Sequence, residues 1–129
     1  MGCANEGYWR AMSRELDRAR RFAMGLPETT EQPHFDLSSW RVRGKIFATI
    51  PPGGDTLRIN VDPDECHALV EGDPAAFAEI IWGKRPVRDW VQVNLPAADP
   101  SEVRELLEDA WRRKAPKRVV SAYDAEQAI

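Results

Sequence analysis

Cysteine and histidine are scarce in this chain. Its 129 residues include two cysteines, Cys3 and Cys66, and two histidines, His34 and His67. Two cysteines cannot build the disulfide framework of a small secreted domain. The neighbouring Cys66 and His67 have no second pair of zinc ligands, and adjacent residues of a helix point to different faces. We therefore expect reduced thiols, a cytoplasmic chain, no bound metal and no cofactor.

Long apolar runs and catalytic motifs are also missing. No stretch approaches the roughly 18 consecutive apolar residues of a membrane span, so no membrane contact is expected. The sequence has no nucleophile elbow, P-loop or two-histidine helix motif. The glycines of segment 51–54 precede a strand pattern, whereas a phosphate-cradling loop precedes a helix. These absences predict that the chain is not an enzyme.

The charge balance is slightly acidic. Eighteen basic and 21 acidic side chains give a net charge of −3, which argues mildly against nucleic-acid binding. The distribution is uneven, because segment 62–79 has six acidic residues and no Lys or Arg, while segment 112–118 has five basic residues and no acid. Lys84, Arg85 and Arg88 form a second basic cluster. Such clusters mark a binding surface or simply the solvated ends of helices and loops.

The content of 43% hydrophobic and 30% charged residues is that of a globular protein. We expect residues 1–129 to form one domain, with residues 1–7 frayed. Segment 40–50, WRVRGKIFATI, alternates apolar and polar residues on both sides of Gly44, which predicts a β-hairpin with a tight turn at Arg43 and Gly44. Arg41, Arg43 and Lys45 would then crowd the face of this hairpin opposite the core.

Periodicity and breaker residues predict the other elements. Helices are expected at 8–24, 62–72, 73–81, 99–116 and 117–127, strands at 29–35, 56–61 and 90–95, a turn at 36–39, and a basic loop at 82–89. Asp62 and Asp99 are expected to cap their helices. The fold class is therefore α+β, with a single antiparallel sheet of about five strands and helices on one face. The predicted core contains Trp40, Ile46, Leu57, Ile59, Val91, Val93, Leu106 and Leu107.

Five stretches carry a resemblance to a known family: LPETTEQPHF (26–35), RVRGKIFATI (41–50), INVDPDE (59–65), DWVQVNL (89–95) and LLEDAWRRKAPKR (106–118). In order and spacing they resemble the MmcQ/YjbR family of small bacterial proteins. The resemblance implies a compact α+β domain related in shape to type III secretion chaperones. It also implies DNA binding through a double wing of two β loops.

Lys45 and Trp90 stand where the family's G-K-x-F and W-V patterns place them. The resemblance puts one wing at Arg41, Arg43 and Lys45. It puts the second wing on the basic loop, where Trp82 could stack on a base. The full set of expected nucleic-acid contacts is Arg41, Arg43, Lys45, Arg58, Trp82, Lys84, Arg85, Arg88, Arg112, Arg113, Lys117 and Arg118.

Two functions of different classes fit this sequence. The first is a sequence-tolerant module that binds double-stranded DNA through phosphate contacts. The alternative is a module that binds a protein partner or a small ligand, with no role in nucleic-acid binding. Basic clusters gathered on one surface would favour the first, and an open sheet face or an apolar pocket would favour the second. In either case a monomer or weak dimer is expected.

Overall fold

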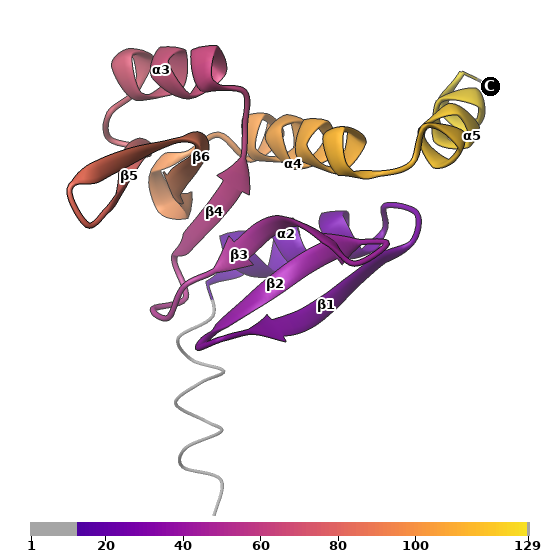
Figure 1. Cartoon of the computed structure of the whole chain (residues 1–129), viewed down its shortest axis with the longest axis horizontal. Coiled ribbons are helices and arrows are strands. Elements are labelled where there is room, and N and C mark those ends of the chain that lie inside the picture. Colours follow the sequence, from indigo (N-terminus) through magenta and orange to yellow (C-terminus); the bar gives the residue numbers. More distant parts are fainter. Residues whose placement is uncertain (1–12, 129) are drawn as a thin grey trace, which may run out of the picture.

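The chain folds as one antiparallel sheet of six strands, with helices α2 and α4 packed against one face (Figure 1). This computed structural model describes residues 13–128. Its elements are α2 (Arg14–Met24), β1 (Thr29–His34), β2 (Leu37–Val42), β3 (Lys45–Ile50), β4 (Thr56–Asn60), α3 (Pro63–Gly72), β5 (Phe77–Trp82), β6 (Arg85–Asn94), η1 (Leu95–Ala97), α4 (Pro100–Lys114) and α5 (Lys117–Gln127). The strand order is β1-β2-β3-β4-β6-β5. The α+β class is therefore confirmed, with six strands in place of about five. The expected helix start at residue 8 and the frayed residues 1–7 lie outside the described residues.

The core lies between the sheet and its helices. Trp40, Ala48, Ile59 and Val91 stand opposite one another on four neighbouring strands, and all four are fully buried. Helix α4 meets this row with a buried stripe of Val103, Leu106, Leu107, Ala110 and Trp111. The stripe follows the 3.6-residue period, so its burial confirms the phase predicted for this helix.

The predicted burial of Ile46 is wrong, because a β-bulge shifts the phase of β3. Trp40 pairs with Ala48, but Arg41 pairs with Ile46, which leaves Phe47 as the extra residue. Phe47 is fully buried, whereas Ile46 shares the opposite face of the sheet with Arg41. The tight turn itself is confirmed, since Arg43 and Gly44 have φ values of 52° and 82°. Across this turn Lys45 pairs with Val42, so Arg41 and Lys45 do not share a face.

The predicted helix at 73–81 and the basic loop at 82–89 are also wrong, because residues 77–94 form a β-hairpin. Segment 77–82, FAEIIW, is rich in β-branched and aromatic residues and forms strand β5. Gly83, with a φ of 66°, and Lys84 make a two-residue turn into β6. The predicted turn at 36–39 is shorter than expected, since Phe35 and Asp36 alone connect β1 to β2.

Two aspartates cap their helices as predicted. The Asp62 carboxylate accepts a hydrogen bond from the backbone N–H of Asp64 at 2.9 Å. The Asp99 carboxylate accepts one from the backbone N–H of Ser101 at 2.8 Å. Each bond satisfies one of the N–H groups that a helix leaves unpaired at its start.

Replacing Asp99 with alanine should lower the free energy of unfolding by about 1 kcal/mol. The cause is the loss of the hydrogen bond to the first turn of α4, the helix that covers the sheet. Urea unfolding followed by circular dichroism measures the change. Glu105→Ala, an exposed position on the same helix, is the control and should have little effect. Equal free energies of unfolding for the Asp99→Ala variant and the wild type would contradict a stabilising role of this cap.

A polar cluster attaches α5 to α4. Tyr123 of α5 donates a hydrogen bond to the Glu108 carboxylate, and its ring packs edge-to-face on Trp111 at a centroid distance of 5.0 Å. Arg112 forms ion pairs with Asp124 at 2.6 Å and with Glu108 at 3.7 Å. Burial, and then the hydrogen bond to Glu108, raise the pKa of Tyr123 to about 12.

Alkaline pH should therefore weaken this attachment. An unfolded tyrosine has a pKa of about 10, so the contribution of Tyr123 is complete below that pH and is lost as the pH rises toward 12. The free energy of unfolding should fall more steeply between pH 9.5 and about 11.5 in the wild type than in Tyr123→Phe. Urea unfolding at several pH values measures the difference. Identical pH dependence in the two proteins would contradict it.

Candidate functional site

The face of the sheet opposite α2 and α4 carries polar side chains. Strand pairing aligns Gln32, Ser39, Thr49, Arg58 and Gln92 across five strands. Their side chains lie on the face opposite the buried row that contains Trp40, because residues next to each other along a strand point to opposite faces. Figure 1 shows α2 behind β2 and β3, with the other side of these strands turned to the viewer. We call this side of the sheet the open face.

A groove runs along the open face, with a cavity volume of about 280 Å³. It is lined by His34, Phe35, Leu37, Ile46, Thr49, Arg58, Ile80, Trp82, Val87 and Trp90. The floor comes from the central strands. The β1–β2 turn contributes to one wall, and the outer part of the β5–β6 hairpin contributes to another. The lining is mainly apolar and includes no carboxylate.

An irregularity in β6 shapes the second wall. Glu79 pairs with Val91, but the next residue, Ile80, pairs with Val87. Arg88, Asp89 and Trp90 therefore have no partner on β5, and bulges of this kind bend and twist a hairpin. Beyond the bend, Ile80 and Trp82 share one face with their partners Val87 and Arg85. This bend brings Ile80, Trp82 and Val87 to the groove.

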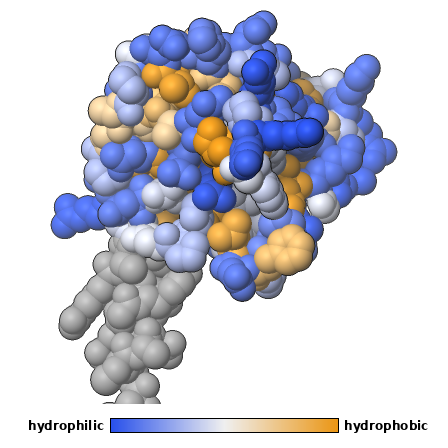
Figure 2. All heavy atoms as spheres, turned by 60° about the vertical axis from the view of Figure 1, so that its left-hand side comes forward, coloured by the Kyte–Doolittle hydropathy of each residue, from blue (hydrophilic) through white to orange (hydrophobic). Residues whose placement is uncertain are grey.

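Large apolar side chains stand exposed at the two rims. Phe35 in the β1–β2 turn is 92% exposed, and Trp82 at the end of β5 is 80% exposed. The Phe35 ring contacts the His34 ring edge-to-face at 4.7 Å. Figure 2 shows hydrophobic residues reaching the surface among hydrophilic ones on the side where the β5–β6 hairpin comes forward. Exposed aromatic groups of this size at a groove are typical of interaction surfaces.

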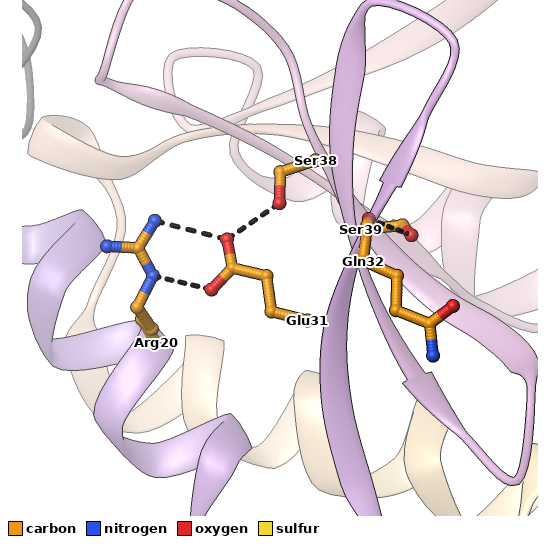
Figure 3. A network of polar contacts seen from close by, with 5 residues as sticks. All are labelled: Arg20, Glu31, Gln32, Ser38 and Ser39. Carbon is orange, nitrogen blue, oxygen red and sulfur yellow. Dashed lines mark hydrogen bonds and ion pairs between the residues drawn. The ribbon is translucent and has the colours of Figure 1, made fainter.

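A polar network fixes the β1–β2 hairpin to α2 (Figure 3). The Glu31 carboxylate accepts hydrogen bonds from Arg20 at 2.9 Å and 3.3 Å and from the Ser38 hydroxyl at 2.6 Å. The Ser39 hydroxyl donates to the backbone carbonyl of Gln32 at 2.7 Å. These contacts hold β1 and β2 in place and so position the turn that carries Phe35.

Four of the expected basic contacts lie on the open face or at the end of the β5–β6 hairpin. Arg58 lines the groove, and its Nε donates to the Gln92 side chain at 3.2 Å. Within residues 13–128 this is its one side-chain hydrogen bond, so its terminal nitrogens have no protein partner. Arg41 donates to Ser39 Oγ at 3.0 Å and to the Pro33 carbonyl at 3.1 Å. Lys84 and Arg85 are exposed at the hairpin end.

The other seven expected basic contacts lie elsewhere, and protein groups engage three of them. Arg43 forms an ion pair with Glu28, and Arg112 pairs with Glu108 and Asp124. Arg113 donates to the side chain and the carbonyl of Asn60. Arg88 lines a different cavity together with Glu71 and Glu79. Lys45, Lys117 and Arg118 are exposed at the β2–β3 turn and on α5. The two expected wings and segment 112–118 therefore do not form one continuous basic surface.

Several groove residues were not predicted from the sequence. The sequence places Phe35 in the edge strand expected at 29–35, Trp90 in the strand expected at 90–95, and Ile80 in the helix expected at 73–81. Trp82, which opens the basic cluster, was the one aromatic residue with a local signal. Ile80 reaches the groove through the irregular pairing of β5 with β6. Phe35 reaches it from the β1–β2 turn, and Trp90 reaches it because it points away from the face of the buried Val91.

Other site types find no support in the described part of the chain. Residues 13–128 contain no group of three or more His, Cys, Asp or Glu side chains placed to hold a metal ion. Burial raises the pKa of the Cys66 thiol, which contacts the Trp90 carbonyl at 3.5 Å, so this thiol is a poor nucleophile. No helix between residues 13 and 128 combines the length and apolar character needed to cross a membrane.

Comparisons with a family model, with curated proteins and with solved structures agree with one another. The YjbR family model matches residues 24–113. The uncharacterised proteins Rv2570 of Mycobacterium tuberculosis and Mb2600 of Mycobacterium bovis are each 29% identical over 126 residues, covering 83% of this chain and 93% of theirs. A crystal structure of the Deinococcus radiodurans protein DR2400, with a DUF419 domain, has a similar fold. Its TM-score is 0.63 at 24% identity, covering 74% of this chain and 75% of that one.

Proposed function

The chain belongs to the YjbR family, and from this membership and the chemistry of its open face we propose that it binds DNA without sequence preference. The observation that carries the proposal is the groove on the open face. Its lining combines aromatic side chains with Arg58 and includes no carboxylate. Lys84 and Arg85 add positive charge at the end of the adjacent hairpin.

Binding on this face rests on phosphate contacts. The terminal nitrogens of Arg58 and the exposed cations of Lys84 and Arg85 can neutralise phosphates, which is the main source of sequence-independent affinity. Arg41 is held on the same face by two hydrogen bonds and adds a fixed positive charge. Because the net charge is −3, the attraction is local, and we expect micromolar or weaker affinity at physiological salt.

Fluorescence anisotropy with labelled DNA at two salt concentrations tests this proposal. Binding should be measurable at low salt, should fall steeply as salt increases, and should differ little between unrelated sequences. Absence of binding at low salt would reject DNA as the ligand.

A specific observation favours a second candidate, a protein partner. The groove is largely apolar, and Phe35 and Trp82 stand exposed at its rims, as aromatic anchors of protein interfaces often do. Affinity purification from an extract treated with nuclease tests this function. A partner that is retained after nuclease treatment and lost in Trp82→Ala would support it.

A further inference from the structure

We propose that the groove on the open face takes unpaired bases, so that this chain prefers single-stranded DNA to the duplex. The inference rests on the proposed function and adds the form of DNA that is bound. It follows from three properties of the groove: exposed aromatic faces, an arginine in a lining without carboxylates, and a position on the face of the sheet.

The aromatic side chains provide the surfaces on which bases stack. Trp82 is 80% exposed and Phe35 is 92% exposed, and the half-buried Trp90 lies between the two walls. Every base has a π face, so stacking on such side chains is tolerant of sequence. In a duplex these faces are covered by the neighbouring base pairs, and a duplex would leave the apolar groove unfilled.

The charges around the groove fit a chain of phosphates. Arg58 and His34 are the ionisable groups in its lining. Arg85 pairs with Trp82 across the hairpin, so a cation stands beside an exposed indole. The cavity beside α3, in contrast, has three carboxylates in its lining, those of Asp64, Glu71 and Glu79. Among these two cavities, only the groove on the open face suits an anionic ligand.

The position of the groove disfavours an extended peptide. A peptide that adds a strand to a sheet uses the unpaired backbone groups of an edge. The floor of this groove is formed by β3, β4 and β6, which are interior strands of the sheet and not its edges. A ligand here must therefore gain affinity from stacking and charge, as bases and phosphates do.

The test compares four labelled ligands of about 12 nucleotides, a length within the usual site size of such proteins. They are a mixed-sequence single strand, oligothymidine, the matching duplex, and a strand of the same length in which the bases are replaced by abasic sites. Anisotropy at low salt measures the affinity of the whole chain for each. We expect the two base-bearing single strands to bind about tenfold more tightly, or better, than the duplex and the abasic strand.

Single substitutions test whether the groove causes the preference for single-stranded DNA. Trp82→Ala and Phe35→Ala should each weaken single-strand binding by about tenfold and leave the weaker binding of duplex and abasic strand unchanged. Ile81→Ala is the matched control. Ile81 is 57% exposed on the same hairpin, but it points to the opposite face from Ile80 and Trp82 and does not line the groove.

The outcomes separate this inference from the proposed function. Equal binding of the duplex and the single strands, unaffected by Trp82→Ala, would overturn the stacking groove and leave DNA binding intact. No binding of any of the four ligands at low salt would overturn both. A preference for single strands that Ile81→Ala reduces as much as Trp82→Ala does would also overturn the role of the groove.

Discussion

Replacing Arg58 and Arg85 together with glutamate should weaken DNA binding strongly while the domain stays folded. Arg58 lines the groove, and within residues 13–128 its terminal nitrogens make no hydrogen bond; Arg85 is exposed beside Trp82. The double change removes two cations from the path of the phosphates and adds two anions. We expect a loss on the order of 100-fold in affinity, with the slope of log affinity against log salt shallower by about 1.4 for a single strand.

The control has the same change in net charge on the helical side of the molecule. Arg18 on α2 and Arg104 on α4 are exposed and line a separate cavity. Arg18→Glu with Arg104→Glu should keep most of the affinity, because screening confines these charges to their own side. Anisotropy measures binding, and circular dichroism with urea unfolding checks that both variants fold. Equal losses in the two double variants would mean that net charge, and not the open face, controls binding.

Truncating Trp111 to alanine should destabilise the domain by about 3–5 kcal/mol. This side chain is fully buried, and its Nε1 donates a hydrogen bond to the Pro27 carbonyl at 3.0 Å. Alanine leaves a cavity between α4 and the sheet and a carbonyl without its donor. It also removes the surface on which the Tyr123 ring of α5 packs. Because a domain of this size has a total stability of about 5–15 kcal/mol, the variant should be partly unfolded in mild denaturant.

Urea unfolding measures this loss, and Trp82→Ala is the matched control. The same residue type is 80% exposed in the control position, so truncation should change the free energy of unfolding by no more than about 0.5 kcal/mol. A similar loss in the free energy of unfolding at the two positions would contradict the assignment of Trp111 to the core and of Trp82 to a binding surface.

Features that depend on neighbouring residues could be predicted from the sequence. The turn at Arg43 and Gly44, the stripe of Leu106, Leu107 and Trp111, and the cap at Asp99 each follow from local patterns. These patterns set backbone dihedral angles and the direction of side chains without reference to the rest of the chain. They were sufficient to predict an antiparallel sheet with helices on one face.

Features that depend on strand pairing could not be predicted in this way. The bulge in β3 places Ile46 on the open face and not in the predicted core, and it places Phe47 in the core. The apolar segment around Ile80 fits both a helix and a strand, and its pairing with β6 decides between them. The engagement of Arg43 and Arg112 by acidic residues also depends on distant parts of the chain. The clusters of basic residues in the sequence therefore predict a larger basic surface than the folded chain has.

The indole N–H signals of the tryptophans test DNA binding on the open face most directly. Trp82 and Trp90 line the groove, whereas Trp40 and Trp111 are fully buried in the core on the other side of the sheet. In a two-dimensional NMR titration with a DNA single strand at low salt, the signals of Trp82 and Trp90 should shift and reach saturation. The signals of Trp40 and Trp111 should stay in place. Unchanged Trp82 and Trp90 signals at saturating DNA would contradict binding on this face.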